Sequence, residues 1–220
     1  MIMEQKTEAV YVVMSATLGK MGIAIRWATR ARFNHVSIAC REDLRDMVSF
    51  ARRYYRTPFC GGFVEESVER YRKKGRYARI VVFRIPVEPS CKEKIQQQLK
   101  AMSENSEEYI YHMLAALQTP FHWTTRARNA YTCLSFAQMI LGQTGVLPPK
   151  TLYRIEDMAK CLERFWVYDG TIEIFNLPSD PKYLRKMPRL RCWRMTVAQN
   201  MKLAIRILHR NDREESEKNG

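Results

Sequence analysis

Two observations predict an α+β fold from the sequence. Short β-prone runs bounded by turn residues recur before Pro89, with a short helical pattern at residues 21–31 after the first of them, and apolar residues at helical spacing dominate most of the chain after Pro89. Two of the β-prone runs are separated by a charged, turn-like segment, which is typical of an antiparallel hairpin. The fold is therefore expected to combine antiparallel strands with helices that come later in the chain.

The first half of the chain contains the predicted strands. They lie at residues 9–16, 35–40, 46–53 and 78–87. The second and third form the predicted hairpin, and His35 opens its first strand. Residues 57–66 contain a proline and a glycine pair, so they are expected to be a loop that leads into a short strand.

The second half contains the predicted helices. They lie at residues 89–105, 106–121 and 132–145. Residues 147–165 are expected to begin with a turn and continue as a helix, and a last strand pair or extended segment is expected at 166–177. Ser90 is the expected N-cap of the first helix, because Glu93 three residues later completes a capping-box pattern. Thr132 is the expected cap of the third helix, which places Cys133 in its first turn.

The chain is strongly basic, with 220 residues, a net charge of +14 and a pI near 9.7. This charge predicts attraction to phosphate-bearing or acidic surfaces, or simply a basic solvated surface. The expected organisation is one main domain at 1–176, a basic and partly helical extension at 177–210, and a disordered tail at 211–220. The N-terminal sequence lacks a secretory pattern and no window approaches about 18 apolar residues, so a cytoplasmic location is expected.

The six cysteines are spread widely and irregularly along the chain. No pair has CxxC spacing, and no histidine follows a cysteine in the rhythm of a zinc finger. A structural metal site and a disulfide framework are therefore not expected, and most of the thiols should be reduced and packed.

Cys133 and His35 are the candidate catalytic pair. The free N–H groups and positive dipole end of a helix give thiolate character to a cysteine in the first turn, and a histidine at the edge of a neighbouring strand can accept its proton. Each residue also has an ordinary explanation, since most cysteines in apolar helices and most strand histidines are structural. The other histidines are expected inside a helix, in a polar loop and in the basic tail: His112, His122 and His209.

Four segments together resemble the permuted branch of the NlpC/P60 papain-like superfamily, which includes YiiX-type amidases and relatives of lecithin retinol acyltransferase. They read RFNHVSIAC, DMVSFARR, PFCGGFVEE and, much later, NAYTCLSFAQMIL. In that branch the histidine strand precedes the nucleophile helix, and here His35 comes 98 residues before Cys133. The resemblance covers residues 9–176 and leaves the basic extension outside.

The resemblance implies a circularly permuted papain-like fold, in which a small antiparallel sheet or barrel packs against the helix that bears the nucleophile. It implies that Cys133 is the nucleophile and His35 the general base of a cysteine amidase, peptidase or acyltransferase. The reaction would pass through a thioester on Cys133 that water or an amine resolves. The substrates implied are small-molecule, peptide or lipid acyl compounds, and no cofactor is expected.

A third residue that orients the imidazole is expected on or after the strand that follows His35. Ser49 is the first candidate, although a serine offers only a neutral hydrogen bond. Glu65, with its neighbour Glu66, is the acidic alternative, and a solvated surface pair is the ordinary explanation for both. Backbone N–H groups at Cys133 are expected to form part of an oxyanion hole. The residues expected to line the substrate pocket are Ser15, Asn34 and Tyr131.

The basic extension contains an amphipathic helical pattern. One face carries Val197, Met201, Ala204, Ile205 and Leu208, while Lys202, Arg206 and Arg210 lie elsewhere. Such a helix could dock on an anionic membrane, bind nucleic acid, or cover the core of the domain. No nucleic-acid motif accompanies it, so nucleic acid is not the expected partner.

Two functional hypotheses arise from the sequence. The first is a cytoplasmic papain-like cysteine hydrolase or acyltransferase that uses Cys133 and His35. The alternative, motivated by the neutral Ser49, is a non-catalytic basic protein of the same fold that docks to an anionic membrane, nucleic acid or an acidic partner. The sequence indicates no oligomeric state.

Overall fold

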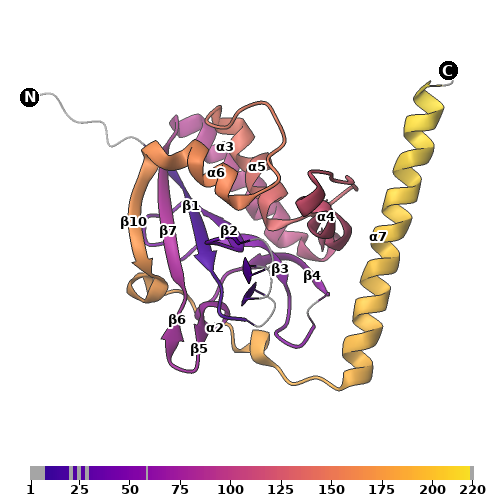
Figure 1. Ribbon diagram of the computed structural model, residues 1–220, viewed down its shortest axis with the longest axis horizontal. Coiled ribbons are helices and arrows are strands. Elements are labelled where there is room, and N and C mark those ends of the chain that lie inside the picture. Colours follow the sequence, from indigo (N-terminus) through magenta and orange to yellow (C-terminus); the bar gives the residue numbers. More distant parts are fainter. Residues whose placement is uncertain (1–7, 20–21, 24–25, 28–29, 58, 219–220) are drawn as a thin grey trace, which may run out of the picture.

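A six-stranded antiparallel sheet packed against helices forms the body of the molecule (Figure 1). The computed structural model describes residues 8–218 except 20, 21, 24, 25, 28, 29 and 58. Among these residues the strand order is β10-β7-β1-β2-β3-β4, and each neighbouring pair runs antiparallel. The predicted α+β class is confirmed.

The strand β1 lies inside the sheet, because it pairs with β2 on one side and with β7 on the other. The strands of the sheet are β1 (Ala9–Ala16), β2 (His35–Ala39), β3 (Val48–Arg52), β4 (Gly61–Glu65), β7 (Arg79–Pro86) and β10 (Trp166–Thr171). The predicted hairpin is confirmed as β2 and β3. Of the two alternatives predicted for residues 166–177, a strand pair or an extended segment, the structure has one extended strand, β10, followed by the 3-10 turn η5 (Ile172–Phe175).

The two faces of the sheet carry separate hydrophobic cores, as the two-residue period of a strand requires. In β1, Val10, Val12 and Met14 belong to the larger core, while Tyr11 and Val13 belong to the smaller one. The larger core is covered by α3 (Pro89–Glu104), α5 (Cys133–Leu141) and α6 (Ile155–Leu162), which lie together on one side of the sheet in Figure 1. The smaller core includes residues of α2 (Val68–Tyr71) and η5.

An aromatic cluster fixes α5 against β3 and β4. Phe136 is fully buried, and its ring centroid lies 5.2 Å from that of Phe50 and 5.9 Å from that of Phe63. Full burial of such a side chain stabilises the fold by about 1.5–3 kcal/mol. The start of α5 is therefore held beside the strands that follow His35.

The helix starts show one confirmed and one corrected prediction. Thr132 caps α5 as predicted, because its Oγ1 accepts the N–H of Ser135 at 3.1 Å while its own N–H donates to Ser135 Oγ at 2.9 Å. Ser90 does not cap α3, whose N-cap is Glu88. Pro89 takes the first helical position, where its fixed φ suits the helix and its missing N–H leaves no bond unmade.

The prediction of one continuous helix at residues 106–121 is wrong. The segment is divided into η1 (Ser106–Glu108), β8 (Ile110–Tyr111), α4 (Met113–Gln118) and η2 (Thr119–Phe121). β8 pairs in parallel with β9 (Ala130–Tyr131), and this pairing interrupts the helix. His112 is consequently the N-cap of α4 instead of an interior residue, and its Nδ1 accepts the N–H of Ala115 at 3.2 Å.

The basic extension packs on the domain before it becomes a long helix. Tyr183 in η6 (Pro181–Leu184) is buried, and Arg52 Nε donates to its hydroxyl at 2.8 Å. Helix α7 spans Arg189–Lys218, so it includes residues 211–218 of the segment predicted to be disordered; residues 219 and 220 lie outside the described residues. No helix in the described part of the chain is both long enough and apolar enough to cross a membrane.

The remaining elements are short. They are β5 (Arg72–Lys73), β6 (Arg76–Tyr77), η3 (Gly142–Thr144) and η4 (Glu163–Phe165). β5 and β6 form a small antiparallel hairpin next to α2. η3 follows α5 directly, and Gly142 is the C-cap of that helix.

The buried N-cap His112 predicts a distinctive pH dependence of stability. Burial lowers the pKa of His112 to about 4, below its value in the unfolded chain, so its contribution to stability is present above about pH 6.5 and is lost as the pH falls toward 4. The variant His112→Asn keeps a capping acceptor and removes the titration. Between pH 6.5 and 4.5 it should lose about 2 kcal/mol less of its unfolding free energy than the wild type. Urea denaturation at both pH values measures this, and parallel losses would contradict it.

Candidate active site

Cys133 is the first residue of α5 and is 8% exposed. The Thr132 cap places it there, at the positive end of the helix dipole. The sulfur accepts hydrogen bonds from the His35 ring and from the backbone N–H groups of Val36 and Leu134. A sulfur with these three donors is stabilised as the thiolate.

His35 is the first residue of β2, and its ring joins the thiol to a carboxylate. Its Nε2 lies 2.6 Å from Oε1 of Glu66, and the ring also hydrogen-bonds to Cys133. Because Nε2 is engaged by Glu66, Nδ1 is the nitrogen left for the thiol. Both side chains are largely buried, with 12% of the His35 side chain and 1% of the Glu66 side chain exposed.

Several further groups surround the Glu66 carboxylate. Ser49 Oγ donates to its Oε1 at 2.6 Å, and Ser37 Oγ donates to the same oxygen at 3.2 Å. Arg70 Nε lies 3.7 Å from its Oε2, and the Tyr71 hydroxyl is 3.3 Å from Ser37 Oγ. The carboxylate is therefore buried but well supported, as a buried charge must be.

Burial by itself would disfavour the charged forms of all three residues, and their mutual interactions outweigh it. Burial lowers the pKa of His35, but the charge of Glu66 and hydrogen bonds to Cys133 and Glu66 raise it to about 10. Burial raises the pKa of Glu66, but the charge of His35 and its hydrogen bond lower it to about 2. The hydrogen bond and charge of His35 likewise lower the pKa of Cys133 below its ordinary value. These shifts favour the charged form of each residue: a thiolate on Cys133, an imidazolium on His35 and a carboxylate on Glu66.

The structure places the candidates for the third residue differently relative to His35. Ser49 contacts the ring of His35 only indirectly, because its hydroxyl donates to Glu66. Glu65 is exposed, and its Oε1 accepts from Ser103 Oγ at 2.8 Å. Side chains of consecutive residues in an extended chain point in opposite directions, so Glu66 reaches His35 and Glu65 does not.

The three residues expected to line the substrate pocket lie in different surroundings. Ser15 is the cross-strand partner of His35, and its buried hydroxyl has no hydrogen-bond partner among the described residues. The side chain of Asn34 bonds to Thr17 and Arg26, so it holds the chain that follows β1. Tyr131 packs against Phe50, with ring centroids 5.1 Å apart. Of these three, Ser15 alone is paired directly with the candidate base.

Tyr111 belongs to the surroundings of Cys133, and sequence reasoning did not single it out. Burial raises its pKa, and the charge of Cys133 raises it further, so the phenol stays protonated. A helix was expected at this position, so the strand β8 was not foreseen. β8 lies close to β4, because a Cβ added to Gly61 of β4 would lie only 3.0 Å from Tyr111 Cβ. A protonated phenol near the thiolate is a hydrogen-bond donor that the site can use.

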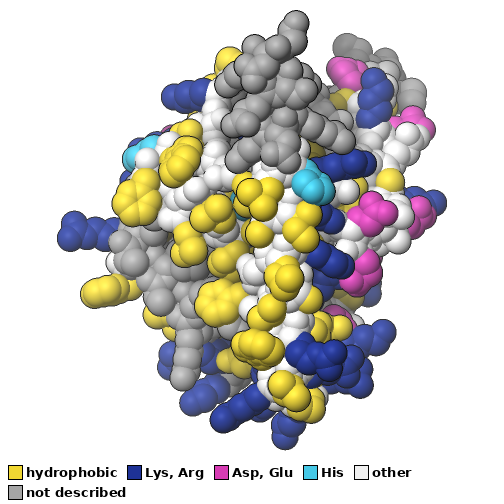
Figure 2. Space-filling view, turned by 90° about the vertical axis from the view of Figure 1, so that its right-hand side faces the viewer, with side chains coloured by type: hydrophobic (Ala, Val, Ile, Leu, Met, Phe, Trp, Pro, Cys, Tyr) yellow, Lys and Arg dark blue, Asp and Glu magenta, His cyan; other side chains and the backbone are white. Residues whose placement is uncertain are grey.

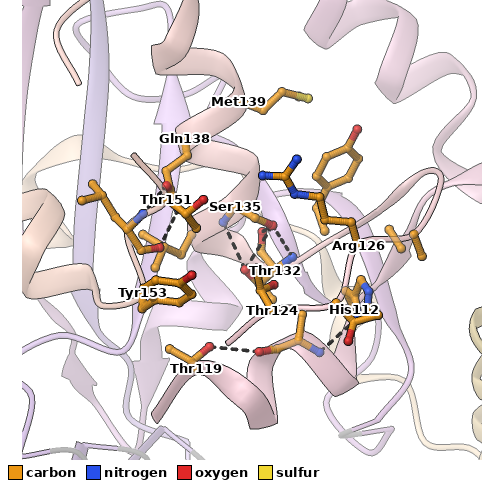
Figure 3. Close-up of a pocket in the computed structure, with 17 residues that line it drawn as sticks. His112, Thr119, Thr124, Arg126, Thr132, Ser135, Gln138, Met139, Thr151 and Tyr153 are labelled. Carbon is orange, nitrogen blue, oxygen red and sulfur yellow. Dashed lines mark hydrogen bonds between the residues drawn. The ribbon is translucent and has the colours of Figure 1, made fainter. Parts of the chain in front are cut away.

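A pocket of about 420 Å³ lies beside α5, but it is not the Cys133 site (Figure 3). Ser135, Gln138 and Met139 of α5 line it, whereas Cys133 and Phe136 belong to the larger core. The capping residues Thr132 and Ser135 at the start of α5 also line the pocket. His112 also lines it, and the Nε2 of that ring has no hydrogen-bond partner among the described residues.

The other histidines and cysteines differ from the candidate pair. The His122 ring contacts Tyr153, and His209 is exposed on α7. Burial, followed by the charge of Asp46, raises the pKa of Cys40 to about 12. All six cysteines are free, and no group of three or more His, Cys, Asp or Glu in the described part of the chain is arranged to hold a metal ion.

In comparisons with known proteins, no family model, curated protein or solved structure matches this chain. The geometry of the chain itself is therefore the basis for assigning it a function. That geometry brings together a helix-start cysteine, a strand-start histidine and a buried glutamate.

The charge state of the site predicts selective alkylation of Cys133. Because its pKa is lowered, Cys133 should react with iodoacetamide at mildly acidic pH, and the rate should stay nearly constant until His35 loses its proton near pH 10. His35→Ala should slow the reaction at acidic pH and restore a rate that rises with pH. Mass spectrometry after brief labelling locates the modified thiols. Labelling of Cys133 no faster than that of Cys91, Cys161 or Cys192, which are less buried, would contradict this prediction.

Proposed function

We propose that the protein is a papain-like cysteine hydrolase or acyltransferase of the permuted type, which acts on an amide, peptide or lipid-ester bond. The observation that carries the proposal is the continuous contact of Cys133, His35 and Glu66. A nucleophile, a base and a group that orients the base are the three components of this chemistry.

The first half of the proposed reaction forms a thioester. The Cys133 thiolate attacks the acyl carbon, and the carbonyl electron pair moves to its oxygen. The backbone N–H of Cys133 at the helix start is available to that oxygen as a donor. When the tetrahedral intermediate collapses, the bond to the leaving group breaks and the leaving group takes the proton from the His35 imidazolium.

The second half releases the acyl group. Neutral His35 takes a proton from water or from an acceptor amine, whose oxygen or nitrogen attacks the thioester carbon. The bond between carbon and Cys133 Sγ then breaks, and the electron pair returns to the sulfur. The site is left as thiolate and imidazolium, ready for another acyl substrate. Water gives hydrolysis, and an amine gives acyl transfer.

Glu66 has the positioning role that the sequence assigned first to Ser49. Its carboxylate fixes the imidazole orientation through Nε2 and stabilises the imidazolium by charge. The neutral Ser49 was the reason for the non-catalytic alternative, and a charged partner at 2.6 Å from the ring favours the catalytic proposal instead. Ser49 acts one step further away, by hydrogen-bonding to that carboxylate, whereas Ser37 Oγ bonds to the carboxylate and also lies 3.3 Å from His35 Nε2.

The arrangement of elements also supports the permuted form of the papain-like fold. The strand with the histidine, β2, comes before the helix with the cysteine, α5, in the chain. The two are neighbours in space, and α5 packs on the face formed by β2 and β3. An antiparallel sheet against a nucleophile-bearing helix is what the resemblance to the NlpC/P60 superfamily implies.

The proposed activity predicts an acyl-enzyme on Cys133. Incubation with p-nitrophenyl butyrate should release p-nitrophenol and add one butyryl group, which intact-mass measurement and peptide mapping would place on Cys133. Cys133→Ala should abolish both signals. Release of p-nitrophenol by Cys133→Ala at the wild-type rate would overturn the proposal, provided that circular dichroism shows the variant folded.

Glu66 and Glu65 form a matched pair for testing the positioning role. Glu66→Gln removes the charge beside His35 and should lower kcat/KM by about tenfold or more, with a smaller effect on KM than on kcat. Glu65→Gln makes the same chemical change one residue away and should leave kcat/KM within about twofold. It should also leave the pH dependence of Cys133 alkylation unchanged, whereas Glu66→Gln should shift that profile upward. Equal effects of the two substitutions would refute the role of Glu66.

A further inference from the structure

Helix α7 packs on the domain through a mostly polar face. Gln199 Oε1 accepts from Cys60 Sγ at 3.1 Å, and Arg206 donates to the backbone carbonyls of Glu108, Arg128 and Asn129. Leu203 is the buried apolar residue of this face, against Ile110 and Ala130. The helix is thus fixed to the domain without using most of its large apolar side chains.

Those apolar side chains form a stripe on the outward face of α7. We call the set the α7 stripe: Leu190, Trp193, Val197, Met201, Ile205 and Leu208. Their spacing of three or four residues keeps them on one side of the helix. Leu190 is 68% exposed, Trp193 63%, Met201 60% and Leu208 60%, while Val197 is half-buried. Figure 2 shows hydrophobic side chains in line along this face.

The segment that carries the α7 stripe is positively charged. No aspartate or glutamate occurs from Pro181 to His209. The exposed cations of this segment are Lys182, Arg185, Lys186, Arg189, Arg191, Arg194 and Lys202. In Figure 2 lysine and arginine side chains gather around the N-terminal end of the helix. Isolated exposed apolar residues are ordinary on protein surfaces, but an aligned stripe on a segment whose charged residues are all basic marks an interaction surface.

We propose that the α7 stripe docks this protein on an anionic phospholipid bilayer, with α7 lying in the plane of the interface. The stripe would enter the boundary between headgroups and acyl chains, with Trp193 at the depth that tryptophan favours. The flanking arginines and lysines would contact lipid phosphates and carboxylates. The face that already contacts the domain is not needed for docking, so no rearrangement is required.

Charge decides between a bilayer and a second copy of the chain as the occupant. Pairing two stripes would bring together two basic borders of chains that each carry a net charge of +14. Like charges at that distance oppose association, whereas an anionic bilayer is complementary to the same border. From the sequence, the apolar face of this helix could have covered the core of the domain or docked on a membrane. Because the stripe faces outward, it does not cover the core, which favours docking on a membrane.

Vesicle co-sedimentation tests the proposal with the full chain. The wild type should sediment with vesicles of equimolar phosphatidylcholine and phosphatidylserine, and should bind at least about tenfold more weakly to phosphatidylcholine alone. The stripe variant Trp193→Gln/Met201→Gln should weaken binding to the mixed vesicles by about tenfold or more. The border variant Arg191→Gln/Arg194→Gln should weaken it by a similar factor, and the remaining binding should be less sensitive to salt.

A matched control uses exposed apolar residues elsewhere on the molecule. Trp166 and Ile174 are 58% and 63% exposed, and they lie on β10 and η5, at the opposite side of the molecule from α7 in Figure 1. The variant Trp166→Gln/Ile174→Gln should bind mixed vesicles like the wild type. Equal binding by the wild type and the stripe variant would overturn the proposal. So would the absence of wild-type binding, or a dimer in sedimentation velocity that the stripe substitutions dissociate.

The membrane proposal stands apart from the proposed enzymatic activity. Cys133→Ala leaves α7 unchanged and should bind mixed vesicles as the wild type does. Conversely, the stripe variant should retain acylation by p-nitrophenyl butyrate, because none of its substitutions touches Cys133, His35 or Glu66. Failure of one proposal therefore leaves the other testable.

Discussion

The buried ion pair between His35 and Glu66 is the interaction on which the candidate site depends. Two charges are removed from water, which is costly unless each one is paired and hydrogen-bonded. The two serines and Arg70 around Glu66 meet that requirement on the carboxylate side. On the other side, the imidazolium faces a thiol that the start of α5 helps to ionise. Each charge makes the next one stable, so the three residues behave as one electrostatic unit.

The architecture keeps this unit in place through elements that have no chemistry of their own. Because β2, β3 and β4 are neighbours in the sheet, His35, Ser37 and Ser49 converge on the carboxylate of Glu66, which directly follows β4. The aromatic contacts of Phe136 hold α5 against the same strands. The Thr132 cap then determines which residue begins the helix. Sheet pairing thus positions the groups around Glu66, core packing positions α5, and helix capping places Cys133 at the start of that helix.

Helix α7 shows a different use of amphipathicity. In most surface helices the apolar face covers the core and the polar face meets water. Here hydrogen bonds from Arg206, Asn200 and Cys60 attach the helix by its more polar side, and a row of large apolar residues faces outward. The proposed catalytic site and the proposed docking stripe on α7 are separate features, so neither proposal requires a change in the residues of the other.

The sequence by itself determined the features that depend on local periodicity and local hydrogen bonding. The α+β class, the β2 and β3 hairpin and the Thr132 cap could all be predicted, and the last of these placed Cys133 at a helix start. The tertiary structure decided the features that depend on which distant segments meet. Pairing of β8 with β9 overrode the helical pattern around His112. The alternation of side chains along the extended chain after β4 directed Glu66, and not Glu65, toward His35. The direction of the apolar face of α7 was decided in the same way, because a hydrophobic pattern gives the width of a face but not what the face contacts.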